Sequence, residues 1–583
     1  MLRGVPVSPG VAVARAYRID EVLARHDPTI LDAAALSAEV SRFEGACAAA
    51  GAELETISER VGKQVGADEA AIFQAHRLLL RDPALIGKVT GRILHERLDA
   101  ASALRATLDE YSALFAQIQD EYIRERLTDI RDVVGRVMAH LTLLHQPECL
   151  NRGEEVILTA PEILPSQSVM FERMKVAGII TEKGATTGHA AILARSLGIP
   201  AVSGLTKLLR EVQTGDLVAV DGREGVVHVK PGPEVESAYR KLQREYFHLR
   251  DKLVENRDLE PVTTDGQKVE LLANVNGPPD ARNAVAVGAT SVGLYRTEYV
   301  FLTHQAVPSE DEQVSTYREV IEAAPNRSVT IRTLDLGGDK QVGYLGNARE
   351  ANPFMGWRSI RLSTDYPEFF QTQLRAILRA SVAGDIKVLF PMVSTLEEVR
   401  RLKGWVDATK DQLTRDGLAF RDDVPVGIMI EVPSAALCID DLLDEVDFVS
   451  IGSNDLLQYV MAADRDNPKV AHLCDPFTPA IYKLLHQVIS TCNARGTPVT
   501  LCGEMAGRPR CVLPLIGMGL RRFSMSPAFV PTVKQVVRAT DLATATIAAQ
   551  RVLAMRTVDD IKTFLTQRIR QIAPDVAMFD TFQ

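Results

Sequence analysis

A regular alternation of strand-like and helical segments over residues 262–583 constrains the fold more than any other feature of this sequence. Eight apolar, β-rich runs occur there, and helical stretches separate them. The runs are VELLANV (from 269), SVGLYRTE (291), SVTIRTLDL (328), KVLFPMV (387), VGIMIEV (426), FVSIGSNDL (448), PVTLCGEMAG (498) and RRFSMSP (521). Eight such units in roughly 300 residues match a (β/α)8 TIM barrel, whose catalytic groups lie at the carboxyl ends of the strands.

The rest of the sequence predicts further domains, because 583 residues exceed what one hydrophobic core usually supports. Short strand patterns occupy 1–20 and 144–230, whereas 21–143 has few glycines and helical periodicity. We expect one α/β domain from 1–20 and 144–230, with the 21–143 helical bundle inserted in it. A charged, unbroken helix over 231–261 would link this part to the barrel. The predicted fold class is an α/β multidomain protein.

Charge and cysteine usage disfavour several classes of function. A net charge of −10 argues against a nucleic-acid surface, and much of it lies on the bundle, since residues 20–136 contain 21 acidic and 14 basic side chains. The seven cysteines lack CxxC or Cys/His ligand spacing, which indicates reduced thiols rather than disulfides or a zinc site. Turn residues interrupt the amino-terminal segment before a signal-like core develops, and no later apolar run has the length of a membrane span. We therefore predict a cytoplasmic protein.

Polar residues stand at the ends of the predicted barrel strands. They are Arg296 after the second strand, Arg332 in the third, Glu431 after the fifth, Asn454 and Asp455 after the sixth, and Cys502 in the seventh. The carboxylates of Glu431 and Asp455 are suited to Mg2+, a hard ion that prefers oxygen ligands and keeps positions open for substrate. Such an ion implies an anionic ligand, although neighbouring arginines offer both carboxylates an alternative partner.

Arginine supplies the complementary half of such a site, because its planar fork grips carboxylate or phosphate oxygens through two hydrogen bonds. Arg296, Arg332, Arg358 and Arg465 all lie on predicted barrel loops. A single arginine near a strand end is more often a salt-bridge partner, but the convergence of four favours ligand binding. Cys502 is as compatible with a small core residue as with an acid or nucleophile at the barrel mouth.

A second candidate site lies in the segment AGIITEKGATTGHAAILARSLGIPAV, where His189 opens a predicted helix after a strand and a glycine-bearing turn. Imidazole is an effective nucleophile near neutral pH. Helix amides and hydroxyls such as that of Thr187 would stabilise a phosphoryl group on it. The same position is equally compatible with a histidine that merely caps its helix.

These segments together resemble enzyme I of the bacterial phosphotransferase system over essentially the whole chain. The matching strings are SPG (8–10), the histidine segment, GLYRTE (293–298), RTLDLGGDK (332–340), NPFMGWRSIR (352–361), IMIEVPSA (428–435), FVSIGSNDLLQY (448–459) and LCGEMAG (501–507). The resemblance implies that phosphoenolpyruvate phosphorylates His189, that Arg296, Arg332, Arg465 and Asn454 bind phosphoenolpyruvate, that Glu431 and Asp455 hold Mg2+, and that Cys502 protonates enolpyruvate to give pyruvate. We add Arg358 and Asp455 to the expected substrate-binding residues.

The resemblance also implies two protein partners. The acidic helical subdomain would dock the basic face of a histidine-containing phosphocarrier protein, and the barrels would form a homodimer. Asp68, Glu69, His76 and Leu79 are the expected docking residues, although each is equally compatible with a solvated helix face. Because His189 must meet both substrate and carrier, the α/β domain should swivel about 230–261.

Three residues depart from the family pattern. Where the family commonly has GGxTSH, this chain has GATTGH, so that Ala185 replaces a glycine and Gly188 replaces the serine before His189. Ser168 stands where a threonine often supports the histidine. We expect these changes to affect the tuning of phosphohistidine more than the reaction.

Other functions are less consistent with the sequence than the first step of sugar uptake, which the resemblance implies. A pyruvate-phosphate dikinase or phosphoenolpyruvate synthase needs a large ATP-grasp domain. This chain has no room for one, because only about 120 helical residues precede the histidine domain, and no glycine-rich nucleotide loop appears. A magnesium-dependent aldolase or lyase would share the barrel but not the histidine domain. A regulatory binding protein that has lost catalysis is a further alternative, of which Gly188 would be the first sign. The intact barrel residues disfavour this alternative. A nitrogen-type regulatory phosphotransferase is the closest alternative, and we favour carbohydrate transport because no nitrogen-sensing domain precedes the chain.

Overall fold

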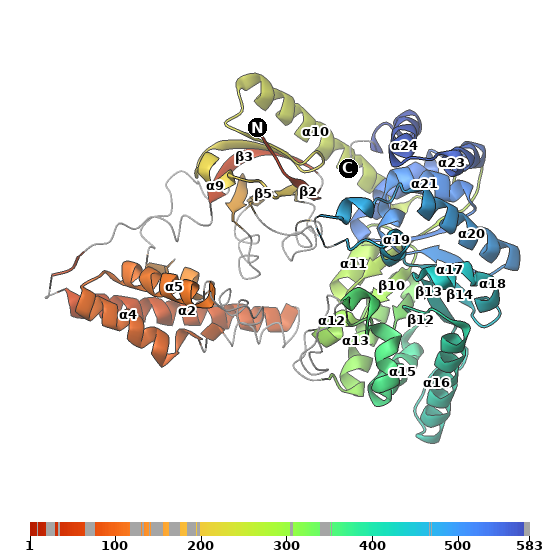
Figure 1. The fold of residues 1–583 in the computed structure, drawn as a ribbon, viewed down its shortest axis with the longest axis horizontal. Coiled ribbons are helices and arrows are strands. Elements are labelled where there is room, and N and C mark those ends of the chain that lie inside the picture. Colours follow the sequence, from red (N-terminus) through yellow and green to blue (C-terminus); the bar gives the residue numbers. More distant parts are fainter. Residues whose placement is uncertain are drawn as a thin grey trace. The chain divides into compact units, whose positions relative to one another are not determined.

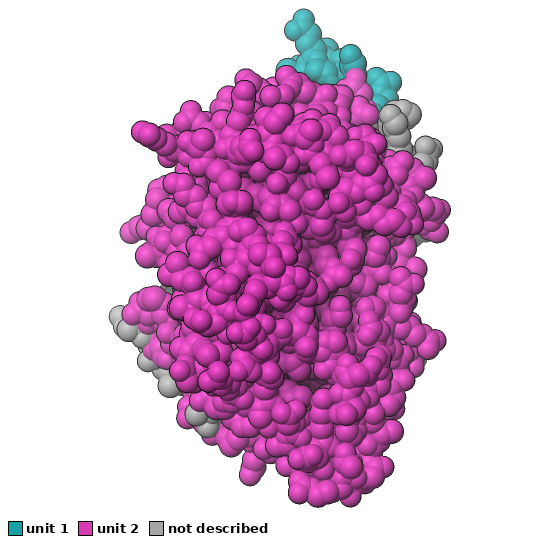
Figure 2. All heavy atoms as spheres, turned by 90° about the vertical axis from the view of Figure 1, so that its right-hand side faces the viewer, with its two compact units in different colours: residues 1–244, 582–583 teal, residues 245–581 magenta. Residues whose placement is uncertain are grey.

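The structure is a computed structural model that describes residues 1–8, 10–18, 30–32, 35–64, 76–77, 79–116, 130, 133–138, 140–141, 155–161, 175–182, 194, 199–302, 307–337, 350, 352–465, 467 and 469–576. The chain divides into two compact units, whose main segments are Met1–Arg244 and Glu245–Thr581. Figure 2 shows the second unit in magenta as a continuous packed body on the face in view. Each unit is built around its own sheet.

The first unit contains an eight-stranded mixed sheet in the order β1-β8-β7-β3-β4-β5-β6-β2. Its strands are β1 (Leu2–Arg3), β2 (Val5–Ser8), β3 (Val11–Arg18), β4 (Glu155–Ala160), β5 (Lys175–Thr181), β6 (Ala201–Ser203), β7 (Leu217–Asp221) and β8 (Val226–Val229). Strands β3 to β6 run parallel, and the remaining pairs are antiparallel. Strands near the amino terminus therefore share one sheet with strands after residue 154, as the sequence predicted.

The helices expected over 21–143 lie in sequence between β3 and β4, which are neighbours in the sheet. They include α2 (Leu36–Gln64), α4 (Pro83–Glu96) and α5 (Ala100–Ala116). Helix α4 begins where Asp82 accepts a hydrogen bond from the amide of Ala84 and Pro83 occupies the first turn, where no backbone donor is needed. Phe43, Leu54, Ile93 and Leu104 are buried in the core that these helices share. Periodic apolar residues thus gave a correct prediction of an inserted helical subdomain.

The short helix α9 (Leu208–Glu211) lies between β6 and β7, and the last strand, β8, is followed by α10 (Pro233–Glu255) and the 3-10 turn η2 (Asn256–Asp258). Helix α10 coincides with the charged, unbroken stretch predicted as a linker helix. Among the described residues, no helix is both long and apolar enough to cross a membrane.

The second unit is a closed barrel of eight parallel strands (Figure 1). The strands are β9 (Glu270–Val275), β10 (Val292–Arg296), β11 (Ser328–Arg332), β12 (Asp385–Phe390), β13 (Val426–Ile430), β14 (Phe448–Ile451), β15 (Val499–Leu501) and β16 (Arg522–Met525). Each lies within or beside one of the eight predicted runs, so the predicted barrel is confirmed.

Helices surround the strands of the barrel, as α11, α13, α15 and α16 do in Figure 1. The helices of this unit are α11 (Pro278–Ala286), α12 (Glu298–Leu302), α13 (Glu310–Ala323), α14 (Leu362–Asp365), α15 (Pro367–Ala380), α16 (Leu396–Arg415), α17 (Pro433–Leu437), α18 (Ile439–Leu442), α19 (Ser453–Met461), α20 (Pro479–Arg495), α21 (Pro509–Gly517), α22 (Val530–Arg538), α23 (Leu542–Ala554) and α24 (Val558–Ile572). Reciprocal capping boxes fix the starts of two of them, through Ser309 with Glu312 and Thr395 with Glu398.

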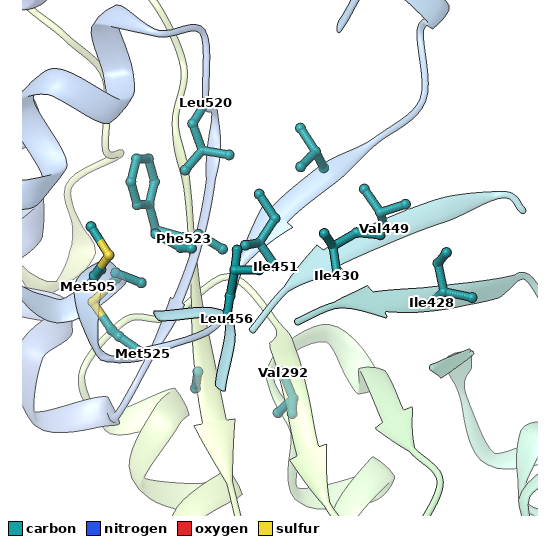
Figure 3. Close-up of a cluster of buried hydrophobic side chains, with 14 of the residues drawn as sticks. Val292, Ile428, Ile430, Val449, Ile451, Leu456, Met505, Leu520, Phe523 and Met525 are labelled. Atoms are coloured by element: carbon teal, nitrogen blue, oxygen red, sulfur yellow. The ribbon is translucent and has the colours of Figure 1, made fainter. Parts of the chain in front are cut away.

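The core of the barrel alternates along each strand. Ile428 and Ile430 of β13 and Val449 and Ile451 of β14 are fully buried in the large cluster between strands and helices (Figure 3). Met429, between the two isoleucines, belongs instead to a small separate cluster with residues of other strands. Because successive side chains of a strand point to opposite faces, this alternation separates a helix-facing layer from the barrel interior.

Candidate active site

Strand alternation directs the predicted site residues toward the barrel interior at the carboxyl ends of the strands. The small interior cluster consists of Leu294, Leu389, Met429, Phe448 and Cys502. Arg296 lies two residues after Leu294, and Glu431 lies two residues after Met429. Because side chains two residues apart in a strand point to the same face, Arg296 and Glu431 are directed to the barrel interior. Arg332 directly follows Ile331, which belongs to the helix-facing layer, so Arg332 is directed to the opposite face, the barrel interior.

Two predicted positions shift by one residue relative to the strand ends. Arg296 is the last residue of β10 rather than the residue after it. Cys502 follows β15, which ends at Leu501, rather than lying within the strand. Only the strand boundaries differ from the expectation, by one residue each, and both side chains lie at the barrel mouth.

Glu431 is a buried carboxylate at the end of β13, only 1% exposed. Its Oε1 accepts a hydrogen bond of 2.7 Å from the amide of Met392, which follows β12. Burial, and then the charges of Asp455 and Asp335, raise the pKa of Glu431 to about 8. A Cβ on Gly452 would lie 2.7 Å from Glu431 Oε2, so the absence of a side chain at Gly452 makes room for this carboxylate.

Asp455 lies in the first turn of α19, directly after β14, and is buried. Its Oδ1 lies 3.1 Å from Nη1 of Arg358 and 3.7 Å from Nη1 of Arg465. Both guanidinium groups also lie over the ring of Phe354, at 5.9 and 6.0 Å from its centre. Asp455 therefore brings together the two arginines that come from different loops.

Arg358 is held by a second carboxylate that the sequence analysis did not single out. Its Nε and Nη2 donate to Oδ1 and Oδ2 of Asp335, each at 2.8 Å. Burial alone would lower the pKa of Arg358, but Asp335 and Asp455 raise it above its usual range. Nη1 of Arg358 also lies 3.3 Å from the hydroxyl of Tyr459, which donates to the carbonyl of Phe354.

Arg332, the last residue of β11, is paired with two carboxylates. Its Nη2 lies 2.5 Å from Oε1 of Glu298, and its Nη1 lies 3.3 Å from Oδ2 of Asp335. Its buried Nε has no hydrogen-bond partner within the described part of the chain, and the same is true of Nη1 of Arg465. Two buried donors at the mouth are thus available to a ligand with acceptor oxygens.

Arg296 differs from the other three arginines. No hydrogen bond or ion pair to its partly buried guanidinium is present among the described residues. Burial, and then the positive charge of Arg332, lower its pKa below the usual range. The carboxylates of Glu298 and Glu504 offset this only in part, so an anion in direct contact would stabilise the Arg296 guanidinium.

Cys502 is 2% exposed and its Sγ lies 3.4 Å from the carbonyl oxygen of Ile451, to which the thiol donates. Burial raises the pKa of the Cys502 thiol to about 11, so the thiol keeps its proton at neutral pH. Asn454 Oδ1 accepts a 2.9 Å hydrogen bond from the amide of Glu504 and so ties the start of α19 to the loop after β15. The structure therefore brings every predicted barrel residue to one end of the barrel.

The donor chemistry at the mouth fits a magnesium ion. Glu431 and Asp455 offer oxygen ligands, and a cation between them would offset both the burial and the repulsion by Asp455 that raise the pKa of Glu431. Within the described ranges, no group of three or more His, Cys, Asp or Glu side chains could hold a metal ion. Two protein carboxylates suit Mg2+, which usually keeps several waters and binds substrate oxygens.

The predicted residues of the amino-terminal unit have different outcomes. His189, Ser168, Ala185, Gly188, Asp68 and Glu69 lie outside the described residues. His76 is 4% exposed, and Leu79 packs partly against the core of the helical subdomain. Of these two predicted docking residues, His76 is therefore largely inaccessible, whereas part of Leu79 is exposed.

Sequence reasoning missed four residues that organise the mouth: Glu298, Asp335, Phe354 and Tyr459. All four belong to strings that carry the family resemblance: GLYRTE, RTLDLGGDK, NPFMGWRSIR and FVSIGSNDLLQY. An acidic residue two or three positions from a candidate ligand-binding arginine was the available signal, as for Glu298 and Arg296 or Asp335 and Arg332.

Comparison with known proteins gives consistent matches along the chain. Three models of PEP-utilising enzymes match in succession: the N-terminal model at residues 3–126, the mobile-domain model at 153–225 and the PEP-binding-domain model at 250–542. The chain is 41% identical over 567 residues to the phosphoenolpyruvate-protein phosphotransferases of Bacillus sp. (strain S) and Geobacillus stearothermophilus, covering 97% of each chain. It is 40% identical over 570 residues to that of Bacillus subtilis (strain 168), covering 98% of this chain and all of that protein.

Proposed function

The chain belongs to the phosphoenolpyruvate-protein phosphotransferase family, and on this premise we propose that it catalyses the first step of the sugar phosphotransferase system through His189. In this reaction the phosphoryl group of phosphoenolpyruvate passes to a nitrogen of the His189 imidazole and then to the histidine-containing phosphocarrier protein, and pyruvate is released. The observation that carries the proposal is the set of four arginines at the barrel mouth, in which Arg296 has no described partner.

The substrate would bind where these arginines converge. Phosphoenolpyruvate carries a carboxylate and a phosphate, and both are groups that a guanidinium fork binds well. Arg296 and the unsatisfied donors of Arg332 and Arg465 supply the positive charge. Arg358 and Asn454 complete the proposed substrate contacts. Positioning of the substrate and neutralisation of its charge are the main sources of rate in phosphoryl transfer.

Enzymes of this family generally depend on Mg2+, and Glu431 and Asp455 would hold the ion in this chain. When bound, the ion would offset negative charge on the phosphoryl oxygens. Glu431 must lose its proton for this role, and its raised pKa means that binding of Mg2+ near neutral pH would release a proton.

Cys502 would supply the proton that completes the reaction. Transfer of the phosphoryl group breaks the bond between phosphorus and the bridging oxygen of phosphoenolpyruvate and leaves the enolate of pyruvate. The protonated Cys502 thiol would give its proton to the methylene carbon, which converts the enolate to pyruvate, and the thiolate would regain a proton from solvent. A thiol with a raised pKa suits a donor, because it is protonated at the start of each cycle.

The organisation of the chain supports the rest of the proposal. We assign the phosphohistidine domain to 1–20 and 144–230, the carrier-binding subdomain to 21–143, the linker to 231–261, and the substrate-binding and dimerisation domain to 262–583. The carrier would dock on the acidic helical subdomain through Asp68, Glu69 and neighbouring residues. The described cysteines are all free thiols, which agrees with a cytoplasmic site of action.

Transfer of radioactive phosphate from labelled phosphoenolpyruvate tests the proposal. We expect the wild type to become labelled when Mg2+ is present, to lose its label to the phosphocarrier protein, and to remain unlabelled in EDTA. His189→Ala should remain unlabelled under all conditions. His486→Ala, which removes an exposed histidine of α20, is the matched control and should behave as the wild type. Label that persists in His189→Ala would refute the acceptor assignment.

A further inference from the structure

Asp335 is a buried acidic residue to which neither the family resemblance nor the proposed mechanism gives a role. It lies three residues after the end of β11 and is 1% exposed. A carboxylate so far from solvent requires compensating charges. Two guanidinium groups supply them, and both belong to arginines proposed to bind substrate.

The contacts of Asp335 fix the orientation of Arg358. Both carboxylate oxygens accept from the Nε and Nη2 edge of Arg358, at 2.8 Å each. A two-point contact of this kind determines the plane of the guanidinium group as well as its position. The remaining nitrogen, Nη1, is thereby directed to Asp455 at 3.1 Å and to the hydroxyl of Tyr459 at 3.3 Å.

The same carboxylate also restrains Arg332. Its Oδ2 lies 3.3 Å from Nη1 of Arg332, while Glu298 holds the Nη2 of that residue. The Nε of Arg332 is left without a hydrogen-bond partner in the described residues. Asp335 therefore links Arg332, the last residue of β11, to Arg358, which lies in the segment after η5 (Pro353–Met355).

We infer that Asp335 is a positioning residue, which sets the relative orientation of Arg332 and Arg358 before the substrate binds. This inference rests on the proposed function, because it concerns how the same anionic substrate is oriented. Preorganised cations contribute to catalysis only when their donors already point to the place where charge develops, and a displacement near 1 Å costs up to about 100-fold in rate. Asp335 acts through the arginines and does not touch the substrate.

Replacement of Asp335 by asparagine tests this role, because the two side chains have the same shape. The amide nitrogen would face a guanidinium nitrogen of Arg358, and two donors cannot bond to each other, so Arg358 must turn. Removal of a negative charge beside the cations does not weaken their attraction for an anion. The loss should therefore fall on kcat, by roughly 10- to 100-fold, while KM for phosphoenolpyruvate changes by less than about threefold.

The matched control is Asp311→Asn on α13. Asp311 also forms an ion pair with an arginine, Arg379, at 2.8 Å, but its side chain is 83% exposed. The control should retain the kcat and KM of the wild type, since an exposed pair contributes little. It separates the loss of a carboxylate at the mouth from the loss of one carboxylate anywhere on the barrel.

A double variant shows whether Asp335 acts through Arg358. Arg358→Lys removes the two-point contact, so Asp335→Asn added to it should lower kcat far less than it does in the wild type. Effects on kcat that multiply in the double variant would overturn the inference. An unchanged kcat in Asp335→Asn would also overturn it, and so would an increase in KM at constant kcat.

Failure of the proposed function and failure of the variant to fold can each be recognised separately from failure of this inference. If the wild type releases no pyruvate from phosphoenolpyruvate, the proposed function fails before Asp335 is tested. If Asp335→Asn does not fold, as judged by its thermal unfolding, Asp335→Glu takes its place with the same criteria. That variant keeps the charge but moves the carboxylate by one methylene group, so a positioning role again predicts a lower kcat.

Discussion

Buried charged side chains have different kinds of partner at the two ends of the barrel. At the carboxyl ends of the strands, Arg332, Arg358 and Arg465 pair with the carboxylates of Glu298, Asp335 and Asp455, and a fourth arginine, Arg296, has no described partner. At the opposite end, the buried ammonium group of Lys534 donates to the carbonyls of Arg257 and Gly288, at 2.7 and 3.2 Å.

The difference separates binding from stability. Charged side chains of opposite sign, with donors left over, form a site that an ion or substrate would complete. A single cation that donates to backbone carbonyls satisfies acceptors that the fold itself creates. In a (β/α)8 barrel the first kind of end is expected to carry catalysis and the second to carry stability. Substitutions at the two ends should therefore move different measurements.

The largest expected effect is that of Arg296→Ala at the mouth. It removes the guanidinium without a described partner, and we expect kcat/KM for phosphoenolpyruvate to fall by roughly 100- to 1,000-fold. The temperature of unfolding should not fall, because burial and the charge of Arg332 already disfavour this cation. Steady-state pyruvate release and thermal unfolding measure the two quantities. An Arg296→Ala protein that unfolds several degrees lower would contradict the distinction between the two ends.

The second prediction concerns the protonation of Cys502. A pKa of about 11, compared with an ordinary value of 9.0, leaves about one hundredth of the thiolate that a free thiol has at the same pH. Because the thiolate is the reactive form, alkylation of Cys502 should be slow at pH 7 and should accelerate as the pH rises toward 11. Mass spectrometry after iodoacetamide treatment measures this, with the exposed Cys438 as an internal reference. Rapid modification of Cys502 at pH 7 would remove the argument for a proton donor.

The third prediction is for Lys534→Met at the base. The carbonyls of Arg257 and Gly288 would lose a donor inside the protein, and we expect the free energy of unfolding to fall by about 2 kcal/mol. Neither kcat nor KM should change, because the substitution is far from the strand ends that carry the arginines. Urea unfolding and pyruvate release give the two values. A loss of activity at full stability would show that the base also serves the reaction.

The smallest effect is expected for Arg522→Gln, also at the base. Arg522 Nε lies 3.0 Å from Oε1 of Glu270, and both side chains are substantially exposed to solvent. Exposed pairs contribute between about 0 and 1 kcal/mol, so stability should change by less than about 0.5 kcal/mol and activity not at all. This variant calibrates the change that a lost ion pair alone produces, against which Lys534→Met is compared.

Much of the barrel site was predictable from local sequence. Apolar runs of strand length located all eight strands, and polar residues at their ends located Arg296, Arg332, Glu431, Asp455 and Cys502. This succeeds because parallel strands in a closed barrel present their carboxyl ends at one mouth. The exact end of a strand was less predictable, as Arg296 and Cys502 show, because the last hydrogen bonds of a ladder depend on neighbouring strands.

The pairing of charges was not predictable. No feature of the local sequence indicates that Arg358 pairs with Asp335, which is 23 residues earlier, and with Asp455, which is 97 residues later. The burial of His76 was also missed, since a polar residue in an amphipathic helix is usually assigned to the solvated face. In both cases the outcome depends on segments that meet only after folding.

The sequence by itself determined the order of strands and helices, the closed barrel and the residue types at its mouth, because hydrophobic periodicity and strand alternation are local properties. Tertiary structure alone decided which arginine is paired and which is left for a ligand, how far Glu431 and Cys502 are removed from water, and that Asp335 joins two loops. The physical reason is that desolvation and charge pairing act through space, and their strength depends on distances that the order of residues does not specify.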